Sequence, residues 1–161
     1  HKHTRPRAST HAPPLEGEDG RLLPLVDVLT PNETEFTHLL ASCAGTRVDS
    51  EALHALSDGA LHDLARRLDV PTVVVTLGSA GAFVSHADPA RWHDALACYR
   101  VPAAPVQPRD TTGAGDAFSG SLAAALAELD DAPFAAAIGH ATKVAGLATE
   151  SPGAAAAMPT R

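Results

Sequence analysis

The sequence predicts an α/β fold, a three-layer sandwich with a mostly parallel sheet, and three observations lead to this prediction. The run Val73-Val74-Val75 is apolar and β-branched without alternation, which is typical of a strand buried on both faces. Apolar residues recur at helical spacing before and after this run, so strands and helices alternate along the chain. The chain has 161 residues, 45% hydrophobic and 19% charged, which suits one domain with a sizeable core.

The first elements follow a strand, turn and helix order. Residues 25–29 form an apolar run suited to a buried strand, and Thr30-Pro31-Asn32 supplies the turn, because proline lacks an amide hydrogen and asparagine caps helices. The helix that follows carries carboxylates in its first turn, where the helix dipole favours them. Residues 50–69 have helical spacing, and we expect Asp58-Gly59 to break them into two pieces.

The second part of the chain predicts two strands, an edge strand and two helices. Residues 70–85 should form two short strands around a glycine turn, and prolines bound the edge strand. In order, the remaining elements are an edge strand at 99–101, a helix that begins near 113–116 and a helix over 133–149. We expect residues 1–20 to be an irregular arm and residues 21–161 to be the folded unit.

Composition excludes several classes of partner. Twelve basic residues against nineteen acidic ones give a net charge of −7, and no basic stripe interleaves with aromatic residues, so neither nucleic acid nor a membrane surface is expected as a partner. The two cysteines form no CxxC pair, and no apolar run approaches the length of a membrane span. We therefore expect a cytoplasmic location. The histidines form no HExxH or His-Cys cluster, which predicts surface or packing roles.

The stretch DTTGAGDAFSGSLAAALAE places three small residues at the start of an apolar helix. A helix N-terminus has amides without partners and partial positive charge, so the backbone of Gly113, Ala114 and Gly115 can approach an anion such as phosphate. A carboxylate does not bind phosphate, and Asp116 suits a general base that takes a proton from an attacking hydroxyl. An ordinary helix start with an acidic first turn is the alternative.

Four segments in order resemble the ribokinase family of sugar kinases, also called the phosphofructokinase-B family: TPNETE, TLGSAG, DTTGAGDAF and PGAAAAMPTR. The resemblance covers residues 22–161 and corresponds to the C-terminal half of a family member. It implies a ribokinase-like sheet truncated on its N-terminal side, without the half that supplies much of the sugar pocket and the lid. We therefore expect residues 1–161 alone to phosphorylate ribose little or not at all.

The resemblance also implies roles for individual residues. Asp116 would deprotonate the sugar hydroxyl, and the Gly113-Ala114-Gly115 backbone would form the anion hole. Asn32 and Glu35 would organise Mg²⁺ and the phosphates of ATP, with Glu35 acting through water; helix capping is the alternative for both. The residues expected at the nucleotide are Asn32, Thr76, Leu77, Gly78, Ser79, Ala80, Gly81, Gly115, Asp116 and Thr142. A plain strand–turn–strand connection is the alternative for residues 76–81.

A monovalent cation site, for K⁺, is implied near the anion hole, and a simple loop is its alternative. Its expected residues are Asp110, Thr112, Ala148, Ser151, Gly153 and Ala157. The implied reaction is ATP-dependent phosphorylation of D-ribose to D-ribose 5-phosphate, with ribose and ATP as small-molecule partners and homodimers among full-length relatives. Two alternatives stay open: a truncated, catalytically incompetent ATP-binding remnant, and a family kinase for another sugar or nucleoside.

Overall fold

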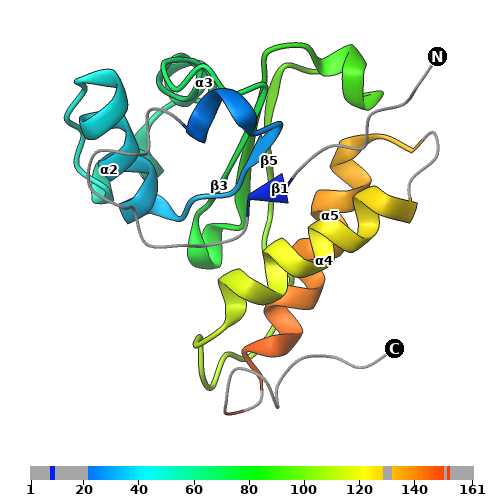
Figure 1. Ribbon diagram of the computed structural model, residues 1–161. Coiled ribbons are helices and arrows are strands. Elements are labelled where there is room, and N and C mark those ends of the chain that lie inside the picture. The colour runs from blue at the N-terminus through cyan, green and yellow to red at the C-terminus, as the bar shows by residue number, and fades with distance from the viewer. Residues whose placement is uncertain (1–7, 10–21, 129–131, 151, 153–161) are drawn as a thin grey trace.

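A five-stranded mixed sheet forms the centre of the molecule (Figure 1). The computed structural model describes residues 8–9, 22–128, 132–150 and 152. The strands lie side by side in chain order: β1 (Ala8–Ser9), β2 (Val28–Leu29), β3 (Thr72–Thr76), β4 (Ala82–His86) and β5 (Cys98–Val101). Strands β1, β2 and β3 are parallel, whereas β3, β4 and β5 are antiparallel.

The mixed sheet differs from the mostly parallel sheet that the sequence predicts. The reason lies in the connection between β3 and β4, which spans only residues 77–81. So short a loop joins antiparallel strands, because a parallel pair needs a crossover of a dozen or more residues. Two of the four strand pairs in the described residues are therefore antiparallel.

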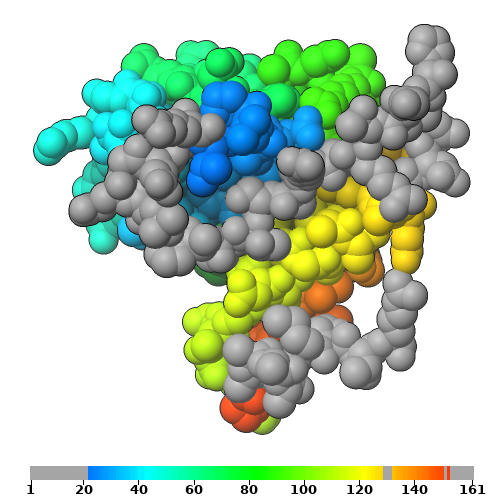
Figure 2. All heavy atoms as spheres, in the orientation of Figure 1, coloured from blue at the N-terminus to red at the C-terminus, as the bar shows by residue number. Residues whose placement is uncertain are grey.

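Helices cover both faces of the sheet, as Figure 1 shows. One layer holds α2 (Glu33–Ala44) and α3 (Asp58–Arg66), and the other holds α4 (Ala114–Glu128) and α5 (Phe134–Ala148). Short 3-10 helices lie between these elements: η1 (Leu23–Leu25), η2 (Glu51–Ala55), η3 (Gly78–Ala80) and η4 (Pro89–Trp92). In the space-filling view, the α4–α5 pair (yellow to orange) forms the lower part of the molecule (Figure 2). The three-layer α/β class is thus confirmed.

Alternation along β3 divides the core between the two layers. Val73 and Val75 pack in the cluster that includes residues of α2 and α3, whereas Val74 packs in the cluster that includes residues of α4 and α5. All three valines are fully buried, which confirms a strand covered on both faces. Successive strand side chains point to opposite faces, so one unbroken apolar run serves both helical layers.

Several element boundaries differ from the prediction. Within residues 25–29 only Val28–Leu29 forms a strand, and Leu25 is the last residue of η1. Residues 50–69 divide into η2 and α3, and Ser57 caps α3 by accepting a hydrogen bond from the Ala60 amide at 3.3 Å. The break is confirmed, and it lies just before Asp58. The edge strand near residues 99–101 and the helix near 133–149 are also confirmed.

The arm expected to be irregular contributes a strand. Ala8 pairs with Val28 and Ser9 pairs with Leu29, so β1 extends the parallel part of the sheet. A two-residue strand has no alternation of its own to detect, and its pairing with β2 comes from the rest of the sheet. The other residues of the arm lie outside the described residues. No helix in the part of the chain that the structure describes is long and apolar enough to cross a membrane.

Candidate active site

Asn32 and Glu35 form a reciprocal capping box at the start of α2. The Asn32 side-chain oxygen accepts a hydrogen bond from the Glu35 amide at 2.9 Å, and the Glu35 carboxylate accepts one from the Asn32 amide at 3.0 Å. Each residue satisfies a backbone donor that the helix itself leaves without a partner. The capping alternative is therefore present in the structure. It also holds the Glu35 carboxylate in one partly buried position.

The segment that begins α2 lies against the loop that follows β3. Asn32 pairs with Thr76 in an isolated parallel bridge, and the Thr76 amide donates to the Pro31 carbonyl at 2.9 Å. Gly78 is close to the Glu33 carboxylate, because a Cβ placed on Gly78 would lie 4.0 Å from Glu33 Oε1. The carboxyl ends of parallel strands lie at one edge of a sheet, which explains why β2 and β3 bring these two segments together.

The residues predicted at the nucleotide in loop 76–81 differ in exposure, and Thr76, which ends β3, is half-buried. Leu77 and Gly81 are buried, and Leu77 belongs to the core below α2 and α3. Gly81 has φ +92°, and a Cβ there would lie 2.0 Å from the Val101 carbonyl oxygen, so only glycine fits against β5. The three residues of η3, between these buried positions, are exposed. They are the part of the loop that can meet a ligand.

Helix α4 begins directly after a left-handed glycine. Gly113 has φ +82°, and the first bond of the α-helical pattern runs from the Ala117 amide to the Gly113 carbonyl at 2.9 Å. The amides of Gly115 and Asp116 precede that bond and belong to the turn that an α-helix leaves without internal acceptors. Asp116 lies in this first turn and is exposed to solvent. Backbone donors and one carboxylate thus lie together at the helix start.

A buried hydrogen bond connects α4 to the segment before α2. Thr30 Oγ1 and Ser119 Oγ lie 3.1 Å apart, and Ser119 follows Asp116 by three residues. Together with the Asn32–Thr76 bridge, this contact joins the three polar segments at one end of the sheet. Sequence reasoning assigned neither Thr30 nor Ser119 to the site, because a lone serine inside an apolar helix gives no signal of its partner.

The loop before α4 is tied to the end of α5. The amides of Arg109 and Asp110 both donate to the Thr149 carbonyl, at 2.7 and 3.0 Å, and the Asp110 carboxylate accepts from the Thr112 amide at 2.9 Å. Ala148 is buried as the last residue of α5. Asp110, Thr112 and Ala148, predicted at the cation site, therefore lie on two segments that touch. Ser151, Gly153 and Ala157 lie outside the described residues.

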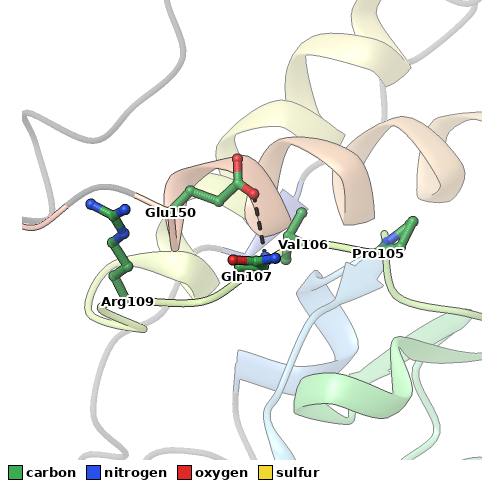
Figure 3. A pocket seen from close by; sticks show the side chains of 5 residues that line it. All are labelled: Pro105, Val106, Gln107, Arg109 and Glu150. Atoms are coloured by element: carbon green, nitrogen blue, oxygen red, sulfur yellow. Dashed lines mark hydrogen bonds between the residues drawn. The ribbon is translucent and has the colours of Figure 1, made fainter.

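A pocket of about 720 Å³ opens beside this junction. Figure 3 shows the Glu150 carboxylate above the Gln107 backbone, whose amide donates to Glu150 Oε1 at 3.3 Å, with Arg109 to one side. The wall is completed by Pro105 and Val106. The described residues hold no group of three or more histidine, cysteine, aspartate or glutamate side chains suited to a metal ion.

Thr142, predicted near the nucleobase, is buried within α5 and only 8% exposed. Its hydroxyl donates to the Gly139 carbonyl of the same helix at 3.0 Å. This bond satisfies the hydroxyl locally, which is a common arrangement for threonine inside a helix. The role of Thr142 at a nucleobase stays a prediction.

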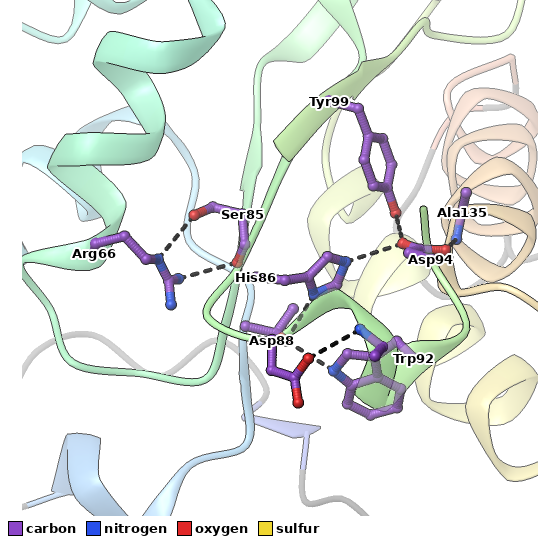
Figure 4. A network of polar contacts seen from close by, with 10 residues as sticks. Arg66, Ser85, His86, Asp88, Trp92, Asp94, Tyr99 and Ala135 are labelled. Carbon is purple, nitrogen blue, oxygen red and sulfur yellow. Dashed lines mark hydrogen bonds and ion pairs between the residues drawn. The ribbon is translucent and has the colours of Figure 1, made fainter. Parts of the chain in front are cut away.

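A second polar cluster lies at the opposite end of β3 and β4 (Figure 4). Trp92 Nε1 donates to Thr72 Oγ1 at 2.9 Å, and the Thr72 hydroxyl bonds His86 Nδ1 at 3.0 Å. His86 Nε2 bonds Asp94 Oδ2 at 3.0 Å, and the Tyr99 hydroxyl donates to the same oxygen. Since the Asp94 carboxylate only accepts hydrogen bonds, its contact with Nε2 assigns the His86 proton to Nε2, and Nδ1 accepts from the Thr72 hydroxyl.

Burial controls the ionisation of this cluster, which we call the Asp94 network. Burial lowers the pKa of His86, although the hydrogen bond that His86 donates to Asp94 opposes the change. Burial also raises the pKa of Tyr99, and its bond to Asp94 acts in the same direction. The packing role predicted for histidines is confirmed for His86. Trp92, which has no aromatic neighbour in sequence, packs against Phe134 with the ring centroids 5.0 Å apart and the ring planes tilted by 56°.

Comparison with known proteins supports the resemblance seen in the motifs. The family described as pfkB family carbohydrate kinase matches residues 2–161, which extends the resemblance beyond the expected residues 22–161. The ribokinase of Haemophilus influenzae is 34% identical over 140 residues, covering 87% of this chain and 40% of that protein. The chain thus spans about two fifths of the length of this curated relative.

Solved structures show the same fold. The ribokinase of Thermotoga maritima superposes with a TM-score of 0.71 at 27% identity, over 91% of this chain and 43% of that one. The fructokinase of Vibrio cholerae, solved with fructose, ADP and calcium ion bound, superposes with a TM-score of 0.63 at 31% identity, over 86% of this chain and 40% of that one.

Proposed function

The chain belongs to the pfkB family of carbohydrate kinases, and on that premise we propose that it forms the nucleotide-binding and catalytic part of an ATP-dependent kinase for D-ribose. The observation that carries this proposal is the convergence of three segments at one end of the sheet. The start of α2, loop 76–81 and the first turn of α4 are joined by the Asn32–Thr76 bridge and the Thr30–Ser119 hydrogen bond. Phosphoryl transfer depends mainly on positioning and on stabilising charge, which such an arrangement supplies.

Asp116 is the general base of the proposed reaction. Its carboxylate takes the proton of the ribose 5-hydroxyl while the hydroxyl oxygen forms a bond to the γ-phosphorus of ATP. The bond between that phosphorus and the bridging oxygen breaks, and ADP leaves with the electron pair. The amides of Gly115 and Asp116 stabilise the charge that develops on the transferred phosphoryl group. Gly113 and Ala114 have no large side chain, so the phosphoryl group can come close to this backbone.

Residues for ATP and Mg²⁺ lie beside this turn. The exposed backbone of Gly78, Ser79 and Ala80 carries no large side chain, so it leaves room for a nucleotide next to Asn32. Mg²⁺, when bound, neutralises phosphate charge. Because the described residues contain no cluster of metal ligands, Glu35 would act on Mg²⁺ through water, from the position that the capping box fixes.

K⁺ is proposed at the junction of α4 and α5. Asp110 and Thr112 lie on the loop whose amides bond the Thr149 carbonyl, so the loop and the end of α5 form two sides of one small region. Carbonyl and carboxylate oxygens are the ligands that such a hard cation prefers. A cation there would offset phosphate charge near the start of α4.

Ribose is proposed as the acceptor because the ribokinases among the similar proteins match over nearly the whole chain. Because a fructokinase is also similar to this chain, another sugar is the competing acceptor. Rates of ADP release measured with ribose, fructose and a nucleoside distinguish these acceptors. The remaining alternative is a chain that binds ATP without transferring phosphate. It predicts nucleotide binding with no sugar-dependent release of ADP.

The test replaces the proposed base in the complete gene product that contains these residues. Asp116→Asn keeps the shape of the side chain but cannot accept the proton, so kcat should fall by about 10²–10⁴-fold while ATP affinity is retained. Asp63→Asn is the matched control, since Asp63 is also an exposed helical aspartate but lies on α3. Sugar-dependent ADP release and ATP binding are measured for both. A rate for Asp116→Asn within twofold of the parent would remove Asp116 from the base role.

A further inference from the structure

The hydrogen bond between Thr30 and Ser119 has the features of a structural constraint on the site. Its two hydroxyls are 3.1 Å apart and 89 positions apart in sequence. Thr30 is 4% exposed and Ser119 is 5% exposed, so solvent water does not replace either partner when the bond is lost. Removing the Thr30 hydroxyl therefore takes this hydrogen bond from the buried Ser119 hydroxyl.

This bond is directional, unlike the apolar contacts around it. Ala117, Phe118 and Leu122 bury the same side of α4. Apolar packing stabilises the layer but is non-directional, so small rotations or shifts of a helix cost it little. A hydrogen bond weakens steeply as its distance and angle change. The Thr30–Ser119 bond thus limits the movement of α4 against the segment that leads into α2.

That constraint reaches Asp116 through the helix. Ser119 lies three residues after Asp116, about 4.5 Å along the helix axis, so the two residues belong to adjacent turns of one rigid element. Thr30 lies two residues before Asn32, whose capping box begins α2. One bond therefore relates the proposed base to the residues proposed at the phosphates.

We propose that Ser119, through its hydrogen bond to Thr30, is a positioning residue that holds Asp116 in register with Asn32 and Glu35. This inference rests on the proposed function. It assigns no chemistry to Ser119, which is buried, and it predicts an effect on turnover more than on binding. A misplacement of about 1 Å in such a site can cost about 10²-fold in rate, which sets the scale of the effect.

The kinetic test compares two serines of the same helix. Ser119→Ala removes the bond to Thr30, whereas Ser121→Ala is the matched control, because the Ser121 hydroxyl donates only to the Phe118 carbonyl of α4 at 3.2 Å. We expect Ser119→Ala to lower kcat by about 10–100-fold with the KM for ATP within about twofold of the parent. Ser121→Ala should keep both values. Equal losses of kcat in the two variants would overturn the inference.

Substitutions of Thr30 supply an independent check. Thr30→Ser keeps the hydroxyl and should retain most of the rate, and Thr30→Val should reproduce the loss seen with Ser119→Ala. The double variant with valine and alanine should be no slower than Thr30→Val alone, because both changes break the same bond. Losses that multiply in the double variant contradict a shared bond.

Amide hydrogen exchange separates this inference from the proposed function. The amides of residues 117–120, which are bonded within the helix, should exchange several-fold faster in Ser119→Ala than in Ser121→Ala, since the first turns of α4 lose their constraint. Unchanged exchange there overturns the positioning role even if the protein is a kinase. If the parent transfers no phosphate, the proposed function fails, and the exchange comparison still decides whether Ser119 holds the start of α4.

Discussion

The two ends of strands β3 and β4 use their polar groups in opposite ways. At one end, Thr72 and His86 face each other and enter the Asp94 network, in which each polar side chain has a partner inside the protein. At the other end, about 13 Å along β3, the loop after Thr76 exposes small residues and backbone. The closed end therefore contributes to stability, while the open end leaves small residues and backbone groups exposed.

Helix α5 depends on the closed end for its start. Its N-cap residue is Pro133, which offers no side-chain hydrogen bond. Asp94 supplies the missing acceptor, since its Oδ1 accepts from the Ala135 amide at 3.2 Å. A buried carboxylate at a helix N-terminus is also stabilised by the helix dipole. By contrast, α2 at the open end is capped by its own Asn32 and Glu35.

The largest effect is expected from Asp94→Ala. This change removes the acceptor that His86 Nε2, the Tyr99 hydroxyl and the Ala135 amide share. The Asp94 side chain is only 3% exposed, so water does not easily replace it. We expect the free energy of unfolding to fall by about 3–5 kcal/mol, measured by urea denaturation. Asp63→Ala, at an exposed helical position, is the control and should cost less than about 0.5 kcal/mol. Similar losses in both variants would refute a special role for the closed end.

Gly81→Ala tests whether the open end is also constrained by packing. The new methyl group would lie 2.0 Å from the Val101 carbonyl oxygen, at a backbone φ of +92° that favours glycine. Since both the strand edge and the loop must shift, we expect a loss of about 2–3 kcal/mol in the free energy of unfolding. Gly59→Ala is the control, because nothing lies within 4 Å of a Cβ there. Equal stability of the two variants would show that loop 77–81 adjusts freely.

Acid should weaken the closed end through its histidines. Burial lowers the pKa of His86 and of His62 in the folded protein, so the unfolded chain binds protons first as the pH falls below about 6.5. The free energy of unfolding should then decrease with falling pH, by at most about 1.4 kcal/mol per pH unit for each histidine, until the folded form is protonated as well. His86 faces Asp94, Tyr99, Arg66 and His62.

The variant His86→Gln isolates that contribution. Glutamine can donate to Asp94 but does not titrate, so the slope of unfolding free energy between about pH 6.5 and 5 should become smaller than in the parent. His38→Gln is the control at an exposed position on α2. A parent slope that is flat across this window, or unchanged by His86→Gln, would contradict the prediction.

The smallest effect on stability is expected at the open end, from Glu35→Gln. Glutamine also serves in a capping box, so it can accept from the Asn32 amide, and the free energy of unfolding should change by less than about 0.5 kcal/mol. If Glu35 acts on Mg²⁺ through water, the Mg²⁺ concentration for half-maximal rate should rise and kcat should fall. Glu51→Gln is the exposed control. An unchanged Mg²⁺ requirement would leave Glu35 with the capping role alone.

Sequence patterns predicted the elements whose causes are local. Valines 73–75 indicated a strand buried on both faces, Asp58-Gly59 marked a helix break, and GAGD indicated the start of α4. Helix periodicity, capping and glycine conformation each act over a few residues, which is why a sequence displays them. The sequence did not predict the strand at Ala8–Ser9 or the shortening of the strand at residues 25–29. Pairing with distant strands sets such boundaries.

The α/β class, the order of the polar segments and the residue types of the proposed site could be predicted from the residues alone. Only the tertiary structure decided which distant groups meet: Thr30 with Ser119 across 89 positions, Asp94 with Ala135 across 41, and β5 against Gly81. The physical reason is that these contacts depend on how layers pack and on which strands pair. The sequence around one hydrogen-bond partner contains no pattern that identifies the other partner. The contact between Thr30 and Ser119, and with it the proposed position of Asp116 relative to the segment that leads into α2, is therefore visible only in the folded chain.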